Sequence, residues 1–144
     1  MLSLLVVALI SATLLPGGSE VWLARLWCLG EPVPMLWLVA TAGNTLGSLV
    51  NVGLGRYARH FQDRRWFPAS RQGLARAEHW YRRFGEWSLL LSWVPLIGDP
   101  LTVLAGVLRL PWWRAIVLIT LAKGMRYGVV LYLANAWLLP LCQA

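Results

Sequence analysis

Two carboxylates in this chain each follow a proline-glycine break between apolar stretches. Glu20 stands four residues after Pro16, and Asp99 stands four residues after Pro95. A carboxylate is costly at membrane depth, so by default it marks a functional site that faces protein or water. Irregular backbone at that depth is tolerated only where it is buried in protein or lines a cavity. One break in each half therefore predicts a site at the interface of two repeats. The residues assigned to the two breaks are Pro16, Gly17, Gly18, Pro95, Gly98 and Pro100.

The composition indicates an integral membrane protein. Of the 144 residues, 58% are hydrophobic and only 13% are charged, whereas a soluble domain carries about 25% charged residues. The chain contains ten tryptophans, a residue type that is enriched at the level of lipid headgroups. The length is that of one compact domain, which we assign to residues 1–144.

The positive charge is concentrated between the two apolar halves. Eight of the twelve arginines lie in residues 56–83. The positive-inside rule explains such a cluster better than nucleic-acid binding does, so residues 56–84 are predicted to form a cytoplasmic loop. Regular apolar spacing after Pro68 predicts an amphipathic helix on the anionic membrane surface. The basic residues assigned to this surface are Arg56, Arg71, Arg76, Arg82 and Arg83.

Both halves follow one plan, in which two short apolar arms around a break precede a longer apolar segment. In the first repeat, residues 1–55, a hairpin over 1–30 precedes a spanning helix over 35–55. In the second, residues 85–142, a hairpin over 87–108 precedes a helix over 115–141. The arms are too short for the hydrocarbon core of about 30 Å, so each hairpin is expected to enter and leave the membrane on one side.

This plan predicts an all-α integral membrane protein built as an inverted repeat of re-entrant hairpin and transmembrane helix. A hairpin plus one spanning helix makes an odd number of crossings, so the repeats have opposite orientations. The two hairpins would then enter from opposite faces and bring Glu20 and Asp99 toward each other near the midplane. In this topology Cys28 and Cys142 both lie on the outer side. Two isolated cysteines are too few for a metal site or a disulfide framework.

The helix expected over 35–55 has a polar face and a small-residue face. Asn44 and Asn51 belong to a set with helical spacing, and Gly43 and Gly47 form a G-x-x-x-G pair that permits close approach by another helix. A packing seam and a role in lining a substrate path both remain open for this face.

The last helix contains two cations, Lys123 and Arg126, in an otherwise apolar stretch. Unpaired cations at that depth are costly, so they are expected to pair with Glu20 and Asp99, the acids nearest that depth. Such a set predicts a path for a substrate or protons. A purely structural network of buried ion pairs is the alternative.

Several motifs in a fixed order carry a resemblance to a known family. They are Ser11-Ala12-Thr13-Leu14-Leu15-Pro16-Gly17-Gly18-Ser19-Glu20, Gly43-Asn44-Thr45-Leu46-Gly47 with Asn51 and Gly55-Arg56, Arg83-Phe84-Gly85, Leu91-Ser92-Trp93-Val94-Pro95 with Gly98-Asp99, Ala105-Gly106, and Lys123-Gly124 followed by Arg126-Tyr127. With these motifs the chain resembles the DedA family of bacterial inner-membrane proteins, in its small YqaA-type branch, over nearly the whole sequence.

The resemblance implies a VTT (SNARE-associated) domain with two opposed re-entrant hairpins in a multi-pass protein of the inner membrane. Members of the wider superfamily are implicated in lipid handling, including flippases that recycle undecaprenyl phosphate and eukaryotic phospholipid scramblases, and proton-motive force is attributed to the bacterial ones. Glu20 matches the acid of the first hairpin. In the second, typical members carry a proline-glycine-x-arginine stretch where this chain has Gly98-Asp99-Pro100. Lys123 and Arg126 would then supply the positive charge.

The function expected from these residues is a membrane carrier for a lipid headgroup, in which Lys123 and Arg126 attract phosphate, Glu20 or Asp99 exchanges protons, and Asn44 and Asn51 line the path. A coupled transporter of a small solute and a non-transporting assembly factor remain alternatives. No nucleotide loop, catalytic Ser/His pair or metal cluster is recognisable, so no enzymatic activity and no cofactor are expected. The expected partners are membrane lipids and not nucleic acid, and a homo-oligomer is left open.

Overall fold

The computed structural model describes residues 2–11, 18–57, 71–94, 97–137 and 142. All regular structure within these residues is helical, which confirms the all-α prediction. The elements are α1 (Leu2–Ser11), α2 (Gly18–Cys28), α3 (Val33–Tyr57), α4 (Arg71–Phe84), the 3₁₀ helix η1 (Gly85–Trp93), α5 (Gly98–Val107) and α6 (Trp112–Trp137).

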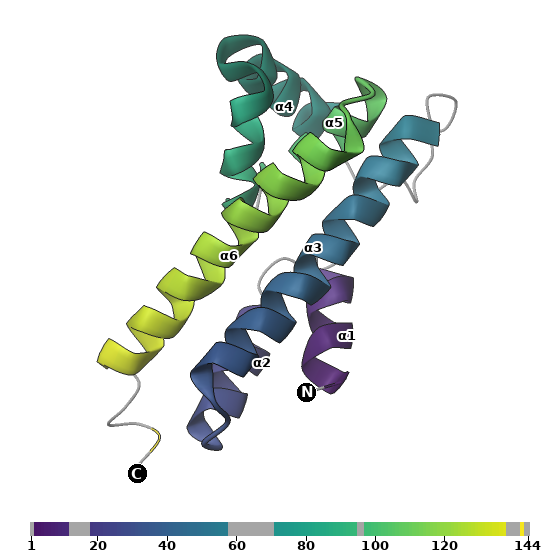
Figure 1. The fold of residues 1–144 in the computed structure, drawn as a ribbon. Coiled ribbons are helices and arrows are strands. Elements are labelled where there is room, and N and C mark those ends of the chain that lie inside the picture. The colour runs from purple at the N-terminus through teal and green to yellow at the C-terminus, as the bar shows by residue number, and fades with distance from the viewer. Residues whose placement is uncertain (1, 12–17, 58–70, 95–96, 138–141, 143–144) are drawn as a thin grey trace.

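The two long helices α3 and α6 form the frame of the molecule. They run side by side in opposite directions, and the shorter elements pack against them (Figure 1). Their 25 and 26 residues correspond to about 38 Å of helix, more than the hydrocarbon core of about 30 Å. Both are apolar enough to cross a membrane.

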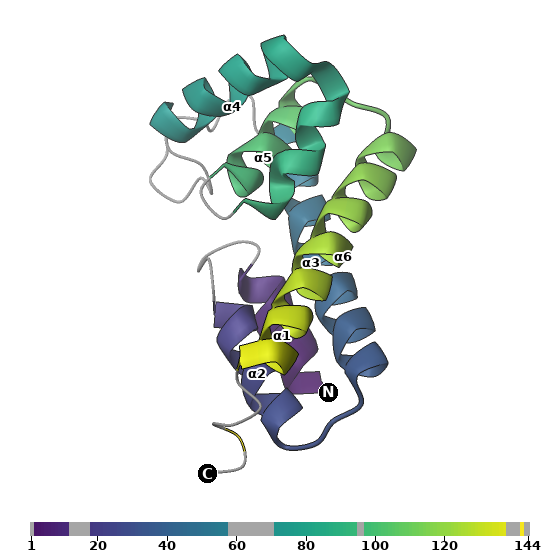
Figure 2. The same cartoon turned by 90° about the vertical axis from the view of Figure 1, so that its left-hand side faces the viewer.

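The short helices form two groups at opposite ends of this frame. The first short pair, α1 and α2, lies at the end where α3 begins and α6 ends, whereas η1, α5 and α4 lie at the other end (Figures 1 and 2). We call η1 and α5 the second short pair. Each end has its own hydrophobic core, one around Leu23 and Leu36 and the other around Leu89 and Leu101. The two halves of the sequence thus build two packed units on one pair of long helices.

Glycines set the distance between α3 and its neighbours. A Cβ atom added to Gly43 would lie 2.7 Å from the carbonyl oxygen of Leu5, so α1 approaches α3 at this glycine. Helices α3 and α5 approach each other closely at Gly55 and Gly106. A Cβ atom on either glycine would overlap a backbone carbonyl of the other helix. The close approach predicted for Gly43 is therefore present, and Gly47 is buried on the same helix.

The observed bounds of the long helices differ from the predicted ones. The first begins at Val33 and ends at Tyr57, and the second begins at Trp112. Proline is favoured in the first helical turn because it has no N–H to satisfy there, and Pro34 and Pro111 stand at these helix starts. Residues 138–141, expected as the end of the last helix, lie outside the described residues.

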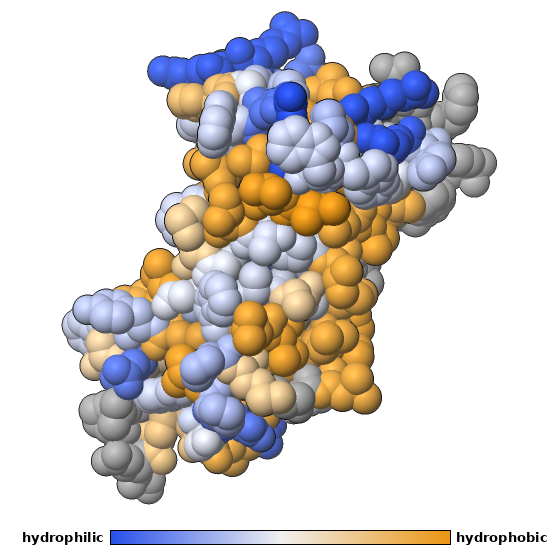
Figure 3. All heavy atoms as spheres, in the orientation of Figure 1, coloured by the Kyte–Doolittle hydropathy of each residue, from blue (hydrophilic) through white to orange (hydrophobic). Residues whose placement is uncertain are grey.

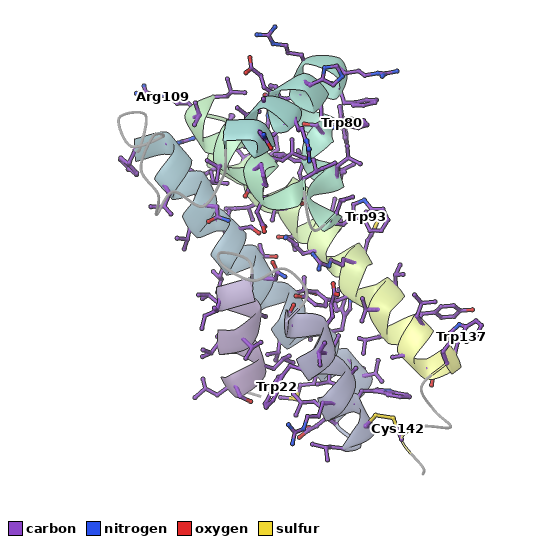
Figure 4. All side chains as sticks on the ribbon, turned by 180° about the vertical axis from the view of Figure 1, so that it is seen from behind. Trp22, Trp80, Trp93, Arg109, Trp137 and Cys142 are labelled. Carbon is purple, nitrogen blue, oxygen red and sulfur yellow. A yellow bond between two sulfur atoms is a disulfide. The ribbon has the colours of Figure 1, made fainter. Side chains whose placement is uncertain are left out.

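On the face shown in Figure 3, hydrophobic patches lie between the two ends of the molecule. Charged side chains gather at the end that carries α4 and, more sparsely, at the opposite end, with hydrophobic atoms between them (Figure 3). Exposed hydrophobic side chains on the long helices include Leu38, Leu46, Val117 and Leu121. Trp22 and Trp137 lie toward one end, Trp80 lies toward the other, and Trp93 lies between them (Figure 4). Tryptophans are enriched at membrane-water interfaces. Two helices of the described residues are long and apolar enough to cross a membrane.

A disulfide joins Cys28, the last residue of α2, to Cys142 (Figure 4). The expectation that these cysteines form no disulfide is wrong. The two cysteines are separated by 114 residues in the sequence. They nevertheless meet in space, because α2 and α6 both end at the same end of the molecule.

Candidate functional site

Four charged side chains meet midway along α6. Arg126 donates from Nε to Oε1 of Glu20 at 2.6 Å, and a second guanidinium nitrogen also contacts that oxygen. One turn earlier, Nζ of Lys123 lies 3.8 Å from Oδ1 of Asp99. Each of the two buried cations of α6 therefore has the carboxylate partner that its depth requires, one from the first short pair and one from the second.

The two members of each pair differ in exposure. The side chain of Lys123 is 2% exposed and that of Asp99 is 22% exposed. The values for Arg126 and Glu20 are 9% and 32%. Taking a buried ion out of water costs several kcal/mol, which only a well-placed partner offsets. The cations are thus held inside the protein, while the carboxylates reach its edge.

Both carboxylates stand in the first turn of a short helix. Glu20 is the third residue of α2 and Asp99 the second residue of α5, and a helix N-terminus favours negative charge. Gly98 is buried, and a Cβ on it would overlap the carbonyl oxygen of Ser92, so α5 and η1 meet closely at this point. Pro100 is buried in the same turn, where a proline is tolerated.

The remaining break residues are described only in part. Gly18 is the exposed first residue of α2. Pro16, Gly17 and Pro95 lie outside the described residues.

Tyr127 links three helices beside the ion pairs. Its side chain is fully buried. Its hydroxyl oxygen accepts from Nδ2 of Asn44 at 2.5 Å and lies 2.8 Å from Oγ of Ser19. The structure thus brings Asn44 next to the charged residues. Sequence reasoning gave Ser19 and Tyr127 no role, although each directly adjoins a charged residue at membrane depth.

The polar face predicted for α3 is buried. Asn51 and Ser48 are both 0% exposed. Among the described residues, Ser48 on α3 and Ser88 and Ser92 on η1 have buried hydroxyls without a hydrogen-bond partner. Buried hydroxyls normally bond to protein or ordered water, so each of these hydroxyls retains hydrogen-bonding capacity.

A groove of about 670 Å³ lies between α2 and α6, and Glu20 stands on its wall. The other lining residues are apolar: Val21, Ala24, Val130, Leu133, Ala134 and Trp137. On α6 these positions continue the spacing of Lys123 and Arg126, so they lie on the same face of the helix. The charged site therefore borders an apolar surface groove.

The arginines assigned to a basic surface fall into two groups. Arg76, Arg82 and Arg83 are exposed on α4, while the side chain of Arg71 lies outside the described residues. Arg56 departs from the prediction, because it belongs to the last turn of α3 and is half-buried. Its guanidinium group donates to the carbonyl oxygen of Leu110. The guanidinium carbon lies 4.8 Å from the ring centre of Trp112, so Arg56 connects α3 to the start of α6.

The fold and this site define a class: a helical membrane protein in which one long helix carries two buried cations, each neutralised from a different short helix pair. The sequence matches the VTT domain family over residues 5–136, a span that includes all four charged residues. The chain belongs to this family, and its resemblance to the DedA group is confirmed.

Its relatives share most of their length with it. It is 43% identical over 129 residues to "Inner membrane protein YqaA" of Escherichia coli K12, covering 89% of this chain and 86% of that protein. An uncharacterized protein of Haemophilus influenzae is 40% identical over 140 residues, covering 92% of this chain and 85% of its own length. No solved structure matches the chain.

Proposed function

We propose that this protein is a carrier that moves the phosphate-bearing headgroup of a lipid across the membrane, without covalent chemistry. The observation that carries the proposal is the position of Glu20. Its carboxylate pairs with Arg126 inside the protein and also lies on the wall of an otherwise apolar groove. A charged site that opens onto an apolar surface suits a substrate with a polar head and a hydrocarbon tail.

The chemistry follows from the pairing of Arg126. An arginine that binds a carboxylate also binds phosphate, often through two parallel hydrogen bonds. An incoming phosphate would therefore compete with Glu20 for the guanidinium group. A displaced carboxylate can take up a proton, which would couple lipid movement to the proton gradient. Lys123 and Asp99 repeat the arrangement one turn away, and Asn44 and Asn51 would line the path.

The proposed placement has both short pairs as re-entrant hairpins in a multi-pass protein of the bacterial inner membrane. The exposed arginines of α4 suit a cytoplasmic loop over residues 56–84. The disulfide of Cys28 lies at the opposite end, and disulfides persist in oxidising compartments such as the periplasm. Two unrelated features thus favour one orientation. The printed name of the Escherichia coli relative, "Inner membrane protein YqaA", agrees with this membrane.

A structural role is the second candidate. The two ion pairs join α6 to both short pairs, which is the arrangement that an assembly factor without transport would also need. In that case, removing either carboxylate would lower stability, and no wild-type lipid movement would be observed.

Lipid movement in proteoliposomes tests the proposal. Labelled undecaprenyl phosphate and a labelled phospholipid are followed with and without a pH gradient, for wild type and for folded Glu20→Gln and Asp99→Asn variants. Glu78→Gln is the matched control, because this exposed carboxylate pairs with Arg82 on α4, away from the site. We expect movement in wild type and in the control, and loss in the two site variants. A folded wild type that moves neither lipid contradicts the proposal and favours a small-solute transporter or an assembly factor.

A further inference from the structure

A second charged cavity lies between η1 and the first half of α6, at the end of the molecule that carries α4. Its volume is about 390 Å³. Arg114 and Glu86 contribute charge to its wall, and Val117, Leu118 and Leu121 contribute an apolar surface. None of these residues belongs to the four-residue site, so the function proposed above leaves this cavity unexplained.

The charges of this cavity are paired but accessible. Nη1 of Arg114 lies 2.7 Å from Oε1 of Glu86, and the two side chains are 44% and 36% exposed. A guanidinium group carries five N–H donors and a carboxylate accepts at two oxygens, so both groups retain capacity for a further polar partner. Together they present one positive and one negative charge side by side.

Two exposed tryptophans line the cavity beside its charged side chains. Trp87 and Trp113 line the cavity and are 71% and 64% exposed, and the guanidinium of Arg114 lies 5.2 Å from the ring centre of Trp113. Exposed tryptophans concentrate at the level of lipid headgroups. Their exposure therefore favours a position of Arg114 and Glu86 at the level of the headgroups of one leaflet.

The polarity of the cavity runs in the same order as that of a phospholipid. From Arg114 to Leu121, α6 advances seven residues, about 10 Å along its axis. Half of the hydrocarbon core is about 15 Å. The wall thus begins with the charged pair and continues as an apolar surface toward the middle of α6.

We propose that this cavity binds a phospholipid with an ethanolamine headgroup. Arg114 would take the phosphate, Glu86 would accept hydrogen bonds from the primary ammonium group, and one acyl chain would follow Val117 and Leu121. A zwitterion matches the paired charges, whereas a headgroup with phosphate alone leaves Glu86 against a second negative charge. A choline headgroup has no N–H to donate to Glu86. The proposal does not depend on lipid transport, because it uses no residue of the four-residue site.

Photo-crosslinking in vesicles of phosphatidylglycerol tests this site. Trace photoactivatable phosphatidylethanolamine, phosphatidylcholine or phosphatidylglycerol is added to full-length protein, and the labelled peptides are mapped by mass spectrometry. We expect the ethanolamine lipid to label the segments of η1 and α6 about fivefold more than the other two, the effect of one partly exposed ionic contact. Equal labelling by the three lipids, or labelling only elsewhere, would show annular lipid and overturn the proposal.

Variants of Glu86 and Arg114 test which part of the headgroup each side chain binds. Glu86→Gln should abolish the ethanolamine preference while phosphate-dependent labelling remains, and Arg114→Gln should weaken labelling by all three lipids. The control pair Glu78→Gln and Arg82→Gln removes an exposed ion pair of the same 2.7 Å length and should change neither. If loss of one charge destabilises the fold, the double change Glu86→Gln with Arg114→Gln leaves no unpaired charge and should lose both the labelling and the ethanolamine preference. An ethanolamine preference that survives in Glu86→Gln contradicts the assignment.

Discussion

At the scale of single residues, Lys123 and Asp99 are buried to different degrees. Removing one partner of this ion pair should therefore destabilise the protein more than removing the other. Asp99→Asn leaves a cation that is 2% exposed without a counter-ion, at a cost of about 3 kcal/mol. Lys123→Met leaves a carboxylate that is 22% exposed and closer to the protein edge. We therefore expect Asp99→Asn to be the more destabilising change. Unfolding in detergent with increasing denaturant measures the difference.

The double variant Lys123→Met with Asp99→Leu removes the ion pair as a whole. It removes both charges, so it should be more stable than Asp99→Asn alone, because replacing a buried ion pair with apolar groups is often tolerated. Equal stability of the two single variants would contradict the argument from burial.

The hydroxyl of Tyr127 is a second residue-level determinant. Tyr127→Phe removes the partner of Asn44 and Ser19 and leaves buried polar groups unpaired, so we expect a loss of about 1–3 kcal/mol. Ser19→Ala removes one contact and should cost less. Thermal unfolding of both variants in detergent checks this order, and a Tyr127→Phe variant as stable as wild type would show that the hydroxyl is not a stabilising link.

At the scale of elements, the crossing of α3 and α5 depends on two glycines. Gly106→Ala places a Cβ against the backbone of α3, and overpacking of this kind costs about 1–3 kcal/mol. Gly53→Ala is the matched control on α3, because its Cβ would lie 3.7 Å from Trp112, an ordinary contact. The control should be neutral or stabilised by up to about 1 kcal/mol. Similar melting temperatures for both variants would show that α5 can move away from α3.

At the scale of the whole molecule, the disulfide reports the orientation. Cys28 and Cys142 are bonded to each other, so spheroplasts should show no labelling by an impermeant maleimide before reduction. After brief treatment with an impermeant reductant, both cysteines should react from outside. Labelling that requires permeabilised membranes would place this end of the molecule in the cytoplasm.

The sequence predicts a feature well when that feature depends on one segment alone, and poorly when it depends on contacts between distant segments. The four charged residues and the two long helices were recognisable because the cost of charge at membrane depth and the length of an apolar run are properties of the segment itself. The link through Tyr127, the disulfide and the role of Arg56 depend on which segments meet in space. Only the folded chain supplies that information. The roles of the charged residues in moving a substrate or protons remain predictions.

Both cations lie on one rigid helix, and this has a mechanical consequence. Lys123 and Arg126 are separated by three residues, about 4.5 Å along the axis of α6. Any rotation or sliding of α6 that draws Arg126 away from Glu20 must also shift Lys123 relative to Asp99. The two short pairs are therefore linked mechanically through α6, because a shift of this helix changes both ion pairs together.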